Sequence, residues 1–246
     1  MSDERRSVSL SGAGKLSGGD YGRVSISGAG KVDGDLKAEE LRISGAGKIT
    51  GKTEATQVSV SGSGVFEGSL SADEMSVSGA GRIEGDAKVK EMKCSGSFRV
   101  SGNLMGEYVK LSGQMRIGGN LEADIFKASG GFDVEGLLSA DRIEVNLGGK
   151  CSAREIGGES IHILRGGFRE KGIILDGLVR LFWHGGAAEL TTASIEGDEI
   201  VLEDTTADVV RGKRITIGAG CHIKVVEYSD TLDVRDGAEV EKQTKL

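Results

Sequence analysis

Three copies of the pentapeptide Ser-Gly-Ala-Gly-Lys are the first feature of this sequence that suggests chemistry, at residues 11–15, 27–31 and 44–48. A glycine-rich turn that ends in Gly-Lys is part of the loop that binds nucleotide phosphates. The complete loop also needs a glycine further upstream and a Ser or Thr after the lysine, whereas here an apolar residue follows each lysine. We therefore interpret the pentapeptide as a recurring chain corner and predict no nucleotide and no other cofactor.

Acidic residues gather at another recurring position, as Glu39 with Glu40, Asp73 with Glu74, and Asp141. Pairs of carboxylates perform general acid and base chemistry in glycosidases, some of which are β-helical. Catalysis needs a local exception to a repeat, and these acids follow the repeat. We interpret them as a solvated face and predict that the protein is not an enzyme.

Candidate metal ligands and nucleophiles are few. The three histidines are His162, His184 and His222, and the three cysteines are Cys94, Cys151 and Cys221. No histidine has a carboxylate or a thiol at ligand spacing, so no metal site is predicted. Cys94 and Cys151 occupy apolar positions and are expected to be small buried hydrophobes. Cys221 stands in a glycine-rich turn and is a candidate free thiol. Three unpaired cysteines favour a reducing cytoplasm.

The elements that position these residues come from a repeat. A Ser-Gly pair recurs first after 16 residues and then every 17, and a further glycine follows it six residues after the first. The serines are Ser11, Ser27, Ser44, Ser61, Ser78, Ser95, Ser112 and Ser129. Regularity over this length is the signature of a repeat architecture.

Apolar residues keep the register of this repeat. Each unit has a pair at positions i and i+2, such as Val24 and Ile26, and a third apolar residue six positions later, such as Val32. Spacing of two is strand periodicity, and no helical stripe is present. Three short strands per 17 residues, bent at glycine corners, predict an all-β parallel β-helix. We expect it to be triangular in section and, from the crossover preference of parallel strands, right-handed.

Composition agrees with this architecture. The chain of 246 residues has 41 Gly and no Pro. Glycine suits tight corners, and proline would remove N–H groups that a strand with two neighbours needs. The net charge is −7, from 31 Lys and Arg against 38 Asp and Glu, so no nucleic-acid partner is predicted. No apolar run is long enough to span a bilayer, and the first residues do not resemble a signal peptide.

Beyond residue 150 the repeat becomes irregular but persists. Val179 and Leu181 continue the apolar pairs, after which the longest interval, 21 residues, holds the single Trp in the segment 181–186. That segment is either a loop packed on the rod or a partner-binding surface. We predict about fourteen coils and a rod roughly 65 Å long. The expected division is a tail at 1–7, regular coils at 8–158, an irregular continuation at 159–240 and a tail at 241–246.

The two ends of such a rod expose apolar columns and unpaired strand edges. Monomeric solenoids cover these ends with caps, and no helix signature precedes the first coil or follows the last. We predict a self-assembly interface made of Val8, Leu10, Leu16, Leu232, Val234 and Val240. The competing interpretation is that short charged tails keep the rod monomeric.

Units such as Ser25–Ala38 and Ser76–Val89, of the form Ser-[Ile/Val]-Ser-Gly-x-Gly-x-[Ile/Val]-x-Gly-Asp-[Leu/Ala]-x-[Ala/Val], resemble the bactofilins, which are bacterial cytoskeletal proteins. The resemblance covers residues 7–150 well and the remainder loosely. It implies a right-handed triangular β-helix that polymerises end to end without nucleotide. It also implies a cytoplasmic scaffold, often at the inner face of the membrane, that positions cell-envelope or motility machinery. Self-association, co-assembly with a paralogous bactofilin and peripheral membrane contact are the partners it suggests.

Two other functions compete with this hypothesis. A left-handed β-helix of the hexapeptide-repeat acyltransferase kind needs a strict six-residue unit, whereas the spacing of Ile26, Val32, Ala38 and Ile43 is 6, 6 and 5. A monomeric solenoid that binds surfaces would show a regular Thr or aromatic array, and serine dominates here.

Overall fold

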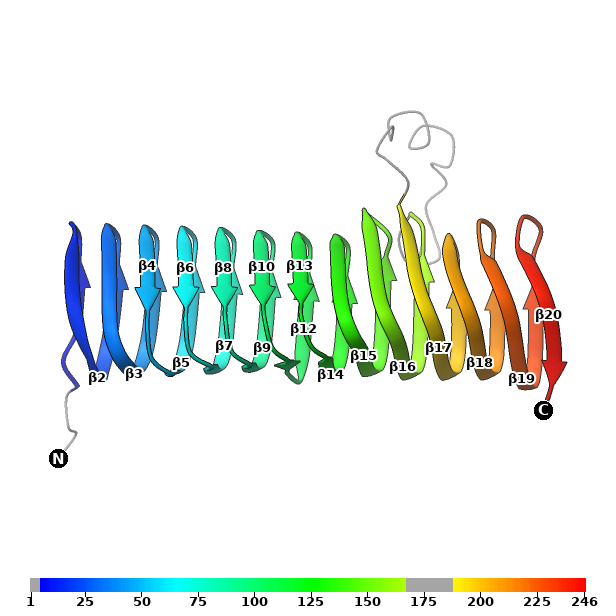
Figure 1. The fold of residues 1–246 in the computed structure, drawn as a ribbon, viewed down its shortest axis with the longest axis horizontal. Coiled ribbons are helices and arrows are strands. Elements are labelled where there is room, and N and C mark those ends of the chain that lie inside the picture. Colours follow the sequence, from blue (N-terminus) through cyan, green and yellow to red (C-terminus); the bar gives the residue numbers. More distant parts are fainter. Residues whose placement is uncertain (1–4, 167–187) are drawn as a thin grey trace, which may run out of the picture.

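Apolar residues that recur along the sequence come to lie above one another in a straight β-solenoid (Figure 1). The computed structural model describes residues 5–166 and 188–246. Within these ranges the chain winds in about 13 turns, and all regular structure is parallel strand. The predicted fold class is confirmed.

The strands fall into two groups by length. In the first part of the rod they are β1 (Val8–Leu10), β2 (Gly14–Ile26), β3 (Ala29–Ile43), β4 (Ala46–Ile49), β5 (Thr53–Val60), β6 (Ser63–Phe66), β7 (Leu70–Val77), β8 (Ala80–Ile83), β9 (Ala87–Cys94), β10 (Ser97–Val100), β11 (Leu104–Met105), β12 (Tyr108–Leu111), β13 (Gln114–Ile117) and β14 (Leu121–Ala128). In the second part they are β15 (Gly131–Asn146), β16 (Lys150–Leu164), β17 (Glu189–Leu202), β18 (Thr205–Ile217), β19 (His222–Val234) and β20 (Glu239–Lys245).

Strand pairing places the predicted columns in direct register. Val24 pairs with Leu41, and Ile26 pairs with Ile43, one coil further along. Two more ladders of the same kind join the other sides of each coil, so every inner strand has a neighbour on both sides. Side chains at these positions alternate between the interior and solvent, which is the strand periodicity seen in the sequence.

The interior is a narrow stack of apolar side chains filled by a few large rings. Phe66, Phe98 and Phe126 are fully buried, and the ring of Phe126 meets that of Phe132 edge to face with centroids 5.4 Å apart. Large residues are accommodated by small ones in the adjacent coil. A Cβ added to Gly81 would lie 2.8 Å from the Phe98 ring, so the glycine makes room for it.

The Ser-Gly corners hold neighbouring coils together at close range. The backbone N–H groups of Ser95 and Gly96 both donate to the carbonyl of Val77 in the preceding coil. A Cβ on Gly96 would lie 2.0 Å from the carbonyl oxygen of Gly79. The recurring glycine is therefore explained by close approach of two backbones.

A second corner uses side chains. The Oδ1 atom of Asp86 accepts a hydrogen bond from the backbone N–H of Asn103, 2.8 Å away. Asn103 does the same for Asn120, and Asn120 for Leu137, at 2.9 and 3.0 Å. Each side chain thus satisfies a corner N–H group of the next coil.

The prediction of about fourteen coils is one too many. Ile161 pairs with Ile200, and Ile163 pairs with Leu202, so β16 and β17 are direct neighbours. Val179 and Leu181, which the sequence suggested as a coil between them, lie outside the described residues, as does the Trp-containing segment 181–186. The whole length between these strands enters at one corner of a single coil.

The C-terminal residues differ from the expected tail. The predicted tail at 241–246 is largely strand, because β20 runs to Lys245 and pairs with β19. Lys242, Gln243 and Thr244 give no apolar signal, but backbone pairing does not need one.

Candidate assembly interface

The first coil leaves one strand edge open at the N-terminal pole. Strand β1 pairs with β2 and with no other described strand. Val8, Leu10 and Leu16 are only partly buried, although they pack against the core. Residues at the same positions in the second coil, such as Val24 and Ile26, are completely buried. The apolar columns therefore continue to the pole and are exposed there.

The segment before β1 is fastened along the side of the rod. The Arg5 guanidinium lies 3.4 Å from a carboxylate oxygen of Asp20 and 3.5 Å from one of Glu39. The carbonyl of Arg6 accepts a hydrogen bond from the backbone N–H of Gly22. Residues 5–7 are exposed and contribute no apolar cover to the pole.

The last coil leaves the corresponding edge open at the C-terminal pole. Strand β20 pairs with β19 alone among the described strands. Leu232 and Val240 are partly buried, and Val234 is 37% exposed. No helix covers either pole in the ranges 5–166 and 188–246.

The six predicted interface residues thus separate into two groups at opposite ends of the rod (Figure 1). Val8, Leu10 and Leu16 form one group, and Leu232, Val234 and Val240 form the other. No contact within one chain can join them. Any interface that uses both groups has to form between copies.

The pentapeptide corners do not offer a phosphate site. In the second copy, the backbone N–H groups of Ser27 and Gly28 both donate to the carbonyl of Leu10. A phosphate loop needs such N–H groups free to point at the ligand. Here they are used to join one coil to the next.

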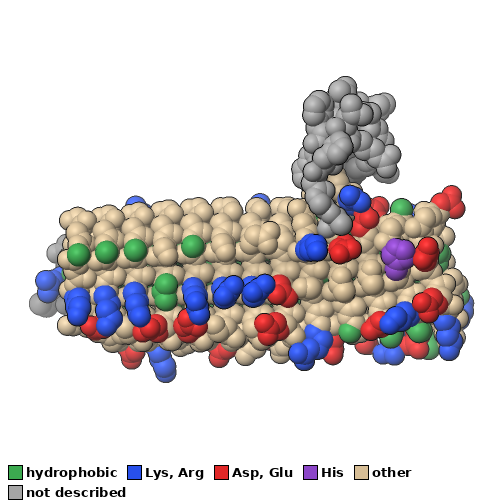
Figure 2. All heavy atoms as spheres, turned by 45° about the horizontal axis from the view of Figure 1, so that its top comes forward, with side chains coloured by type: hydrophobic (Ala, Val, Ile, Leu, Met, Phe, Trp, Pro, Cys, Tyr) green, Lys and Arg blue, Asp and Glu red, His purple; other side chains and the backbone are tan. Residues whose placement is uncertain are grey.

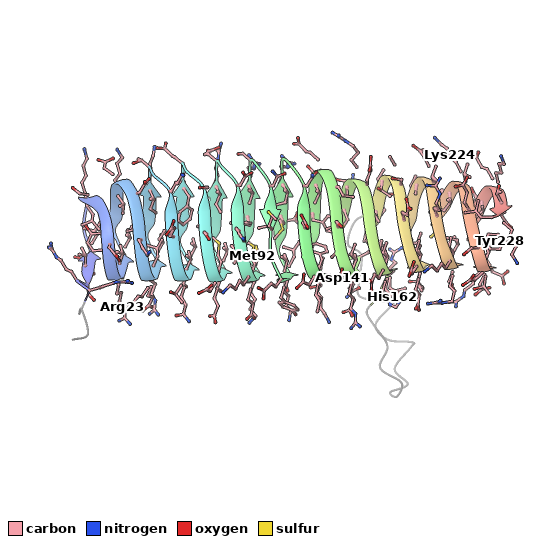
Figure 3. The ribbon with its side chains drawn as sticks, turned by 90° about the horizontal axis from the view of Figure 1, so that it is seen from below. Arg23, Met92, Asp141, His162, Lys224 and Tyr228 are labelled. Carbon is pink, nitrogen blue, oxygen red and sulfur yellow. The ribbon has the colours of Figure 1, made fainter. Side chains whose placement is uncertain are left out.

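The acidic residues on the solvated face are mostly held in ion pairs between or within coils. Glu40 lies 2.6 Å from Arg23 and 2.5 Å from Arg42, and Asp73 lies 2.7 Å from Lys90. These contacts link side chains along the exposed surface, where Arg23 and Asp141 are seen in Figure 3. The arrangement is that of a structural surface, as the sequence predicts.

All three cysteines are free and buried. Burial raises the pKa of each thiol, Cys94, Cys151 and Cys221, to about 11. The suggestion that the turn exposes a Cys221 thiol is therefore corrected: its carboxyl-side turn is at the surface, but its side chain points into the core. A protonated thiol is a poor nucleophile.

The histidines lie beside single carboxylates. His162 is 3.6 Å from an oxygen of Glu199, and His222 is 3.0 Å from one of Glu239. His184 lies outside the described residues. No group of three potential metal ligands occurs in the part of the chain that the structure describes.

One surface feature escaped the sequence analysis. Cationic side chains occupy the same outward position in six of the first seven coils and form a line along one face (Figure 2). This cationic row consists of Lys15, Lys31, Lys48, Arg82, Arg99 and Arg116. The net charge of the chain conceals it. Comparing the residue after the third glycine-like position of each repeat would have found it.

Comparisons with known proteins agree with the solenoid. The bactofilin family, described as polymer-forming cytoskeletal, matches residues 7–88. The uncharacterized protein YhbF of Bacillus subtilis is 38% identical over 65 residues, which cover 26% of this chain and 28% of YhbF. The uncharacterized protein YhbE of the same organism is 47% identical over 57 residues, 23% of this chain and 24% of YhbE.

The matched parts are short on both sides. The chain spans about a quarter of the length of each of these curated relatives. No solved structure matches the chain. Among the described residues no helix is long and apolar enough to cross a membrane.

Proposed function

Because residues 7–88 form a bactofilin domain, a unit of a polymer-forming cytoskeletal family, we propose that this rod assembles pole to pole into filaments. Val8, Leu10 and Leu16 at one pole and Leu232, Val234 and Val240 at the other supply the contacts. The filament serves as a non-enzymatic scaffold.

The observation that carries this proposal is the state of the two poles. Each ends in a strand with one unpaired edge, beside apolar columns that are buried in every inner coil and half-exposed in the terminal ones. Unpaired strand edges are templates for pairing with another chain. Adding a coil from a second copy would bury the columns and satisfy the backbone.

The straight shape of the rod favours open growth. When two copies join through their poles, each end of the pair still has a free pole. A contact that does not close on itself produces a filament. We expect growth without nucleotide, since the corner N–H groups that could hold a phosphate are engaged between coils.

We further propose that the filament lies in the cytoplasm, with peripheral membrane contact at its inner face, and positions cell-envelope or motility proteins. Co-assembly with a paralogous bactofilin belongs to the same proposal. The family match and the three free thiols support the location.

Charges placed at the poles test the assembly. Leu10→Asp and Val234→Asp each put a carboxylate into an apolar column at one pole, where desolvation opposes contact. We expect filaments of the wild type in negative-stain microscopy and large species in sedimentation, with and without nucleotide. Each variant should shorten or abolish them while leaving the β-sheet circular dichroism unchanged.

Ser9→Asp is the matched control, because Ser9 lies between two column residues of β1 but points to solvent. It adds the same charge at the same pole and should leave filaments longer than Leu10→Asp does. Monomers for the wild type and all variants alike would contradict the proposal. So would equal filament lengths for Ser9→Asp and Leu10→Asp.

A further inference from the structure

The cationic row is unusual because it stacks like charges. Strand pairing places Lys15 beside Lys31, and Lys31 beside Lys48, in adjacent strands about 4.8 Å apart. Arg82, Arg99 and Arg116 form the same kind of stack after an interruption at Val65. Like charges directly opposite each other in neighbouring strands destabilise a sheet. Stability of the rod does not account for such a row.

Later coils of the same chain show the stabilising alternative. Glu196, Arg211 and Glu227 follow one another in a column, with alternating charge. The Arg211 guanidinium lies 3.6 Å from Glu196 and 2.7 Å from Glu227. The stacked cations of the first seven coils therefore indicate a negative partner outside the rod.

The two sides of the row differ. On one side a carboxylate pairs with four of the six cations, as Asp33 does with Lys31 and Glu84 with Arg82. The other side carries small residues and forms a shallow groove. Its lining residues are Ala13, Gly14, Lys15, Ala29, Gly30, Lys31 and Ala46. A partner that lies in this groove meets the cations and avoids the carboxylates.

This asymmetry restricts the chemistry of the partner. A planar anionic membrane would face the carboxylate side as well as the cations. Nucleic acid or polyphosphate binds through many uncompensated cations, and two of the six remain without a carboxylate neighbour among the described residues. An extended peptide is narrow, and it can place carboxylates on one side and small apolar side chains on the other.

We propose that the groove beside the cationic row binds an extended acidic peptide segment of a client protein. Its carboxylates contact Lys31, Lys48 and Arg82, and its small side chains lie on Ala29 and Ala46. The inference extends the proposed scaffold by naming the chemistry of what it holds. Binding itself does not need the filament, because the groove runs along the side of each rod.

The test uses the full chain and a labelled peptide of alternating Glu and Ala. About ten residues suffice, since an extended peptide rises about 3.3 Å per residue and the row spans seven coils about 4.8 Å apart. Fluorescence anisotropy at low salt should show binding that weakens as salt screens the charges. Replacing three cations together, Lys31→Gln, Lys48→Gln and Arg82→Gln, should raise the Kd about tenfold, given the modest energy of each exposed ion pair.

A second stack of lysines supplies the matched control. Lys93, Lys110 and Lys127 also lie in register, but on another side of the coil and away from the groove. The triple variant Lys93→Gln, Lys110→Gln and Lys127→Gln removes the same charge. It should bind the peptide within about twofold of wild type. Unchanged circular dichroism establishes that both variants fold.

Three outcomes would overturn the proposal. One is equal loss of binding in the two triple variants, which would show dependence on net charge alone. Another is absence of peptide binding by the wild type. The third is binding of polyphosphate or of phosphatidylglycerol vesicles through the row in preference to the peptide. Val234→Asp separates this inference from the assembly proposal, because it alters the far pole and should leave peptide binding intact whether or not filaments form.

Discussion

The first eight coils and the last five build the same rod by different local rules. In the first part, strands are short and interrupted at Ser-Gly corners, where glycines allow backbone contact between coils. In the last part, strands of 13 to 16 residues run through their bends. Corners there use left-handed residues, Asp204, Gly220 and Gly237, with positive φ angles of 46°, 75° and 83°.

What both parts share is the inward apolar register, from Ile26 and Ile43 to Ile217 and Ile223, all buried. The comparison teaches that the columns specify the solenoid and that the corners can vary. It also explains why the family match ends at residue 88 while the fold continues. A profile of corners and glycines loses its signal where the columns do not.

The largest predicted effect tests whether the two parts unfold together. Phe98 and Leu190 are fully buried in the same column, on either side of the change in corner type. Truncation to Ala should cost about 4 kcal/mol at Phe98 and about 3 kcal/mol at Leu190, from lost burial and the cavity left behind. Urea unfolding followed by circular dichroism measures both.

Hydrogen exchange then shows how far each defect spreads. In a solenoid each coil contacts only its neighbours, so faster exchange should centre on the coils around the substitution. Uniform acceleration along the whole rod in both variants would show that the two parts form one cooperative unit.

The next largest effect concerns the corners. Gly96→Ala places a methyl group 2.0 Å from the Gly79 carbonyl oxygen and should cost about 3 kcal/mol by forcing two coils apart. Gly157 lies in the later part, and a Cβ there meets only Leu137, at 3.9 Å. Gly157→Ala should be neutral or stabilise by about 0.5 kcal/mol. Thermal unfolding of the pair provides the comparison, and equal Tm changes would show that the early corners are not tightly packed.

A smaller effect of opposite sign is expected from two buried threonines. The Thr53 hydroxyl has no hydrogen-bond partner, whereas that of Thr205 donates to the carbonyl of Glu203 at 2.9 Å. Thr53→Val should stabilise the early part by about 1 kcal/mol, and Thr205→Val should destabilise the later part by about 1 kcal/mol. Denaturant midpoints decide the matter. A loss of stability for Thr53→Val would mean that its hydroxyl is satisfied in solution.

The smallest effect at neutral pH should not distinguish the two parts. Burial raises the pKa of Cys94 and of Cys221 to about 11, above the usual thiol value near 8.5. The folded state therefore keeps protons that the unfolded state loses, and stability contributed below about pH 9 should fall as pH rises toward 11. Cys94→Ala and Cys221→Ala should each reduce that slope.

Thiol labelling offers a direct check of the same point. At pH 8 the native protein should react slowly with a disulfide reagent at all three cysteines, and quickly once unfolded. Rapid labelling of native Cys221 alone would show that the later corners open more readily than the early ones.

The architecture could be predicted from the sequence because like side chains recur at the spacing of a whole coil. The same logic failed at Val179 and Leu181, since two apolar residues two positions apart are too short a signal to establish a coil. Pairing of complete strands decides the register, and it joins Ile161 to Ile200. The extent of β20 was missed for a related reason, because Lys242 and Gln243 pair through the backbone alone.

The site was predicted unevenly. Val8 and Val234 are recognisable as pole residues because they begin and end their columns. The cationic row was hidden because charge was summed over the chain, in which carboxylates outnumber cations. A row such as Lys31, Lys48 and Arg82 emerges only when outward positions are aligned coil by coil.

The corner that joins β16 to β17 has a practical consequence. Residues 167–187 enter the chain there, yet Cys151 still pairs with Leu190 and Ile161 with Ile200 across it. The rod therefore accepts a long insertion at this point without a change of register on either side. A fluorescent reporter spliced into the same corner would label each subunit in living cells while leaving both termini of the polypeptide native.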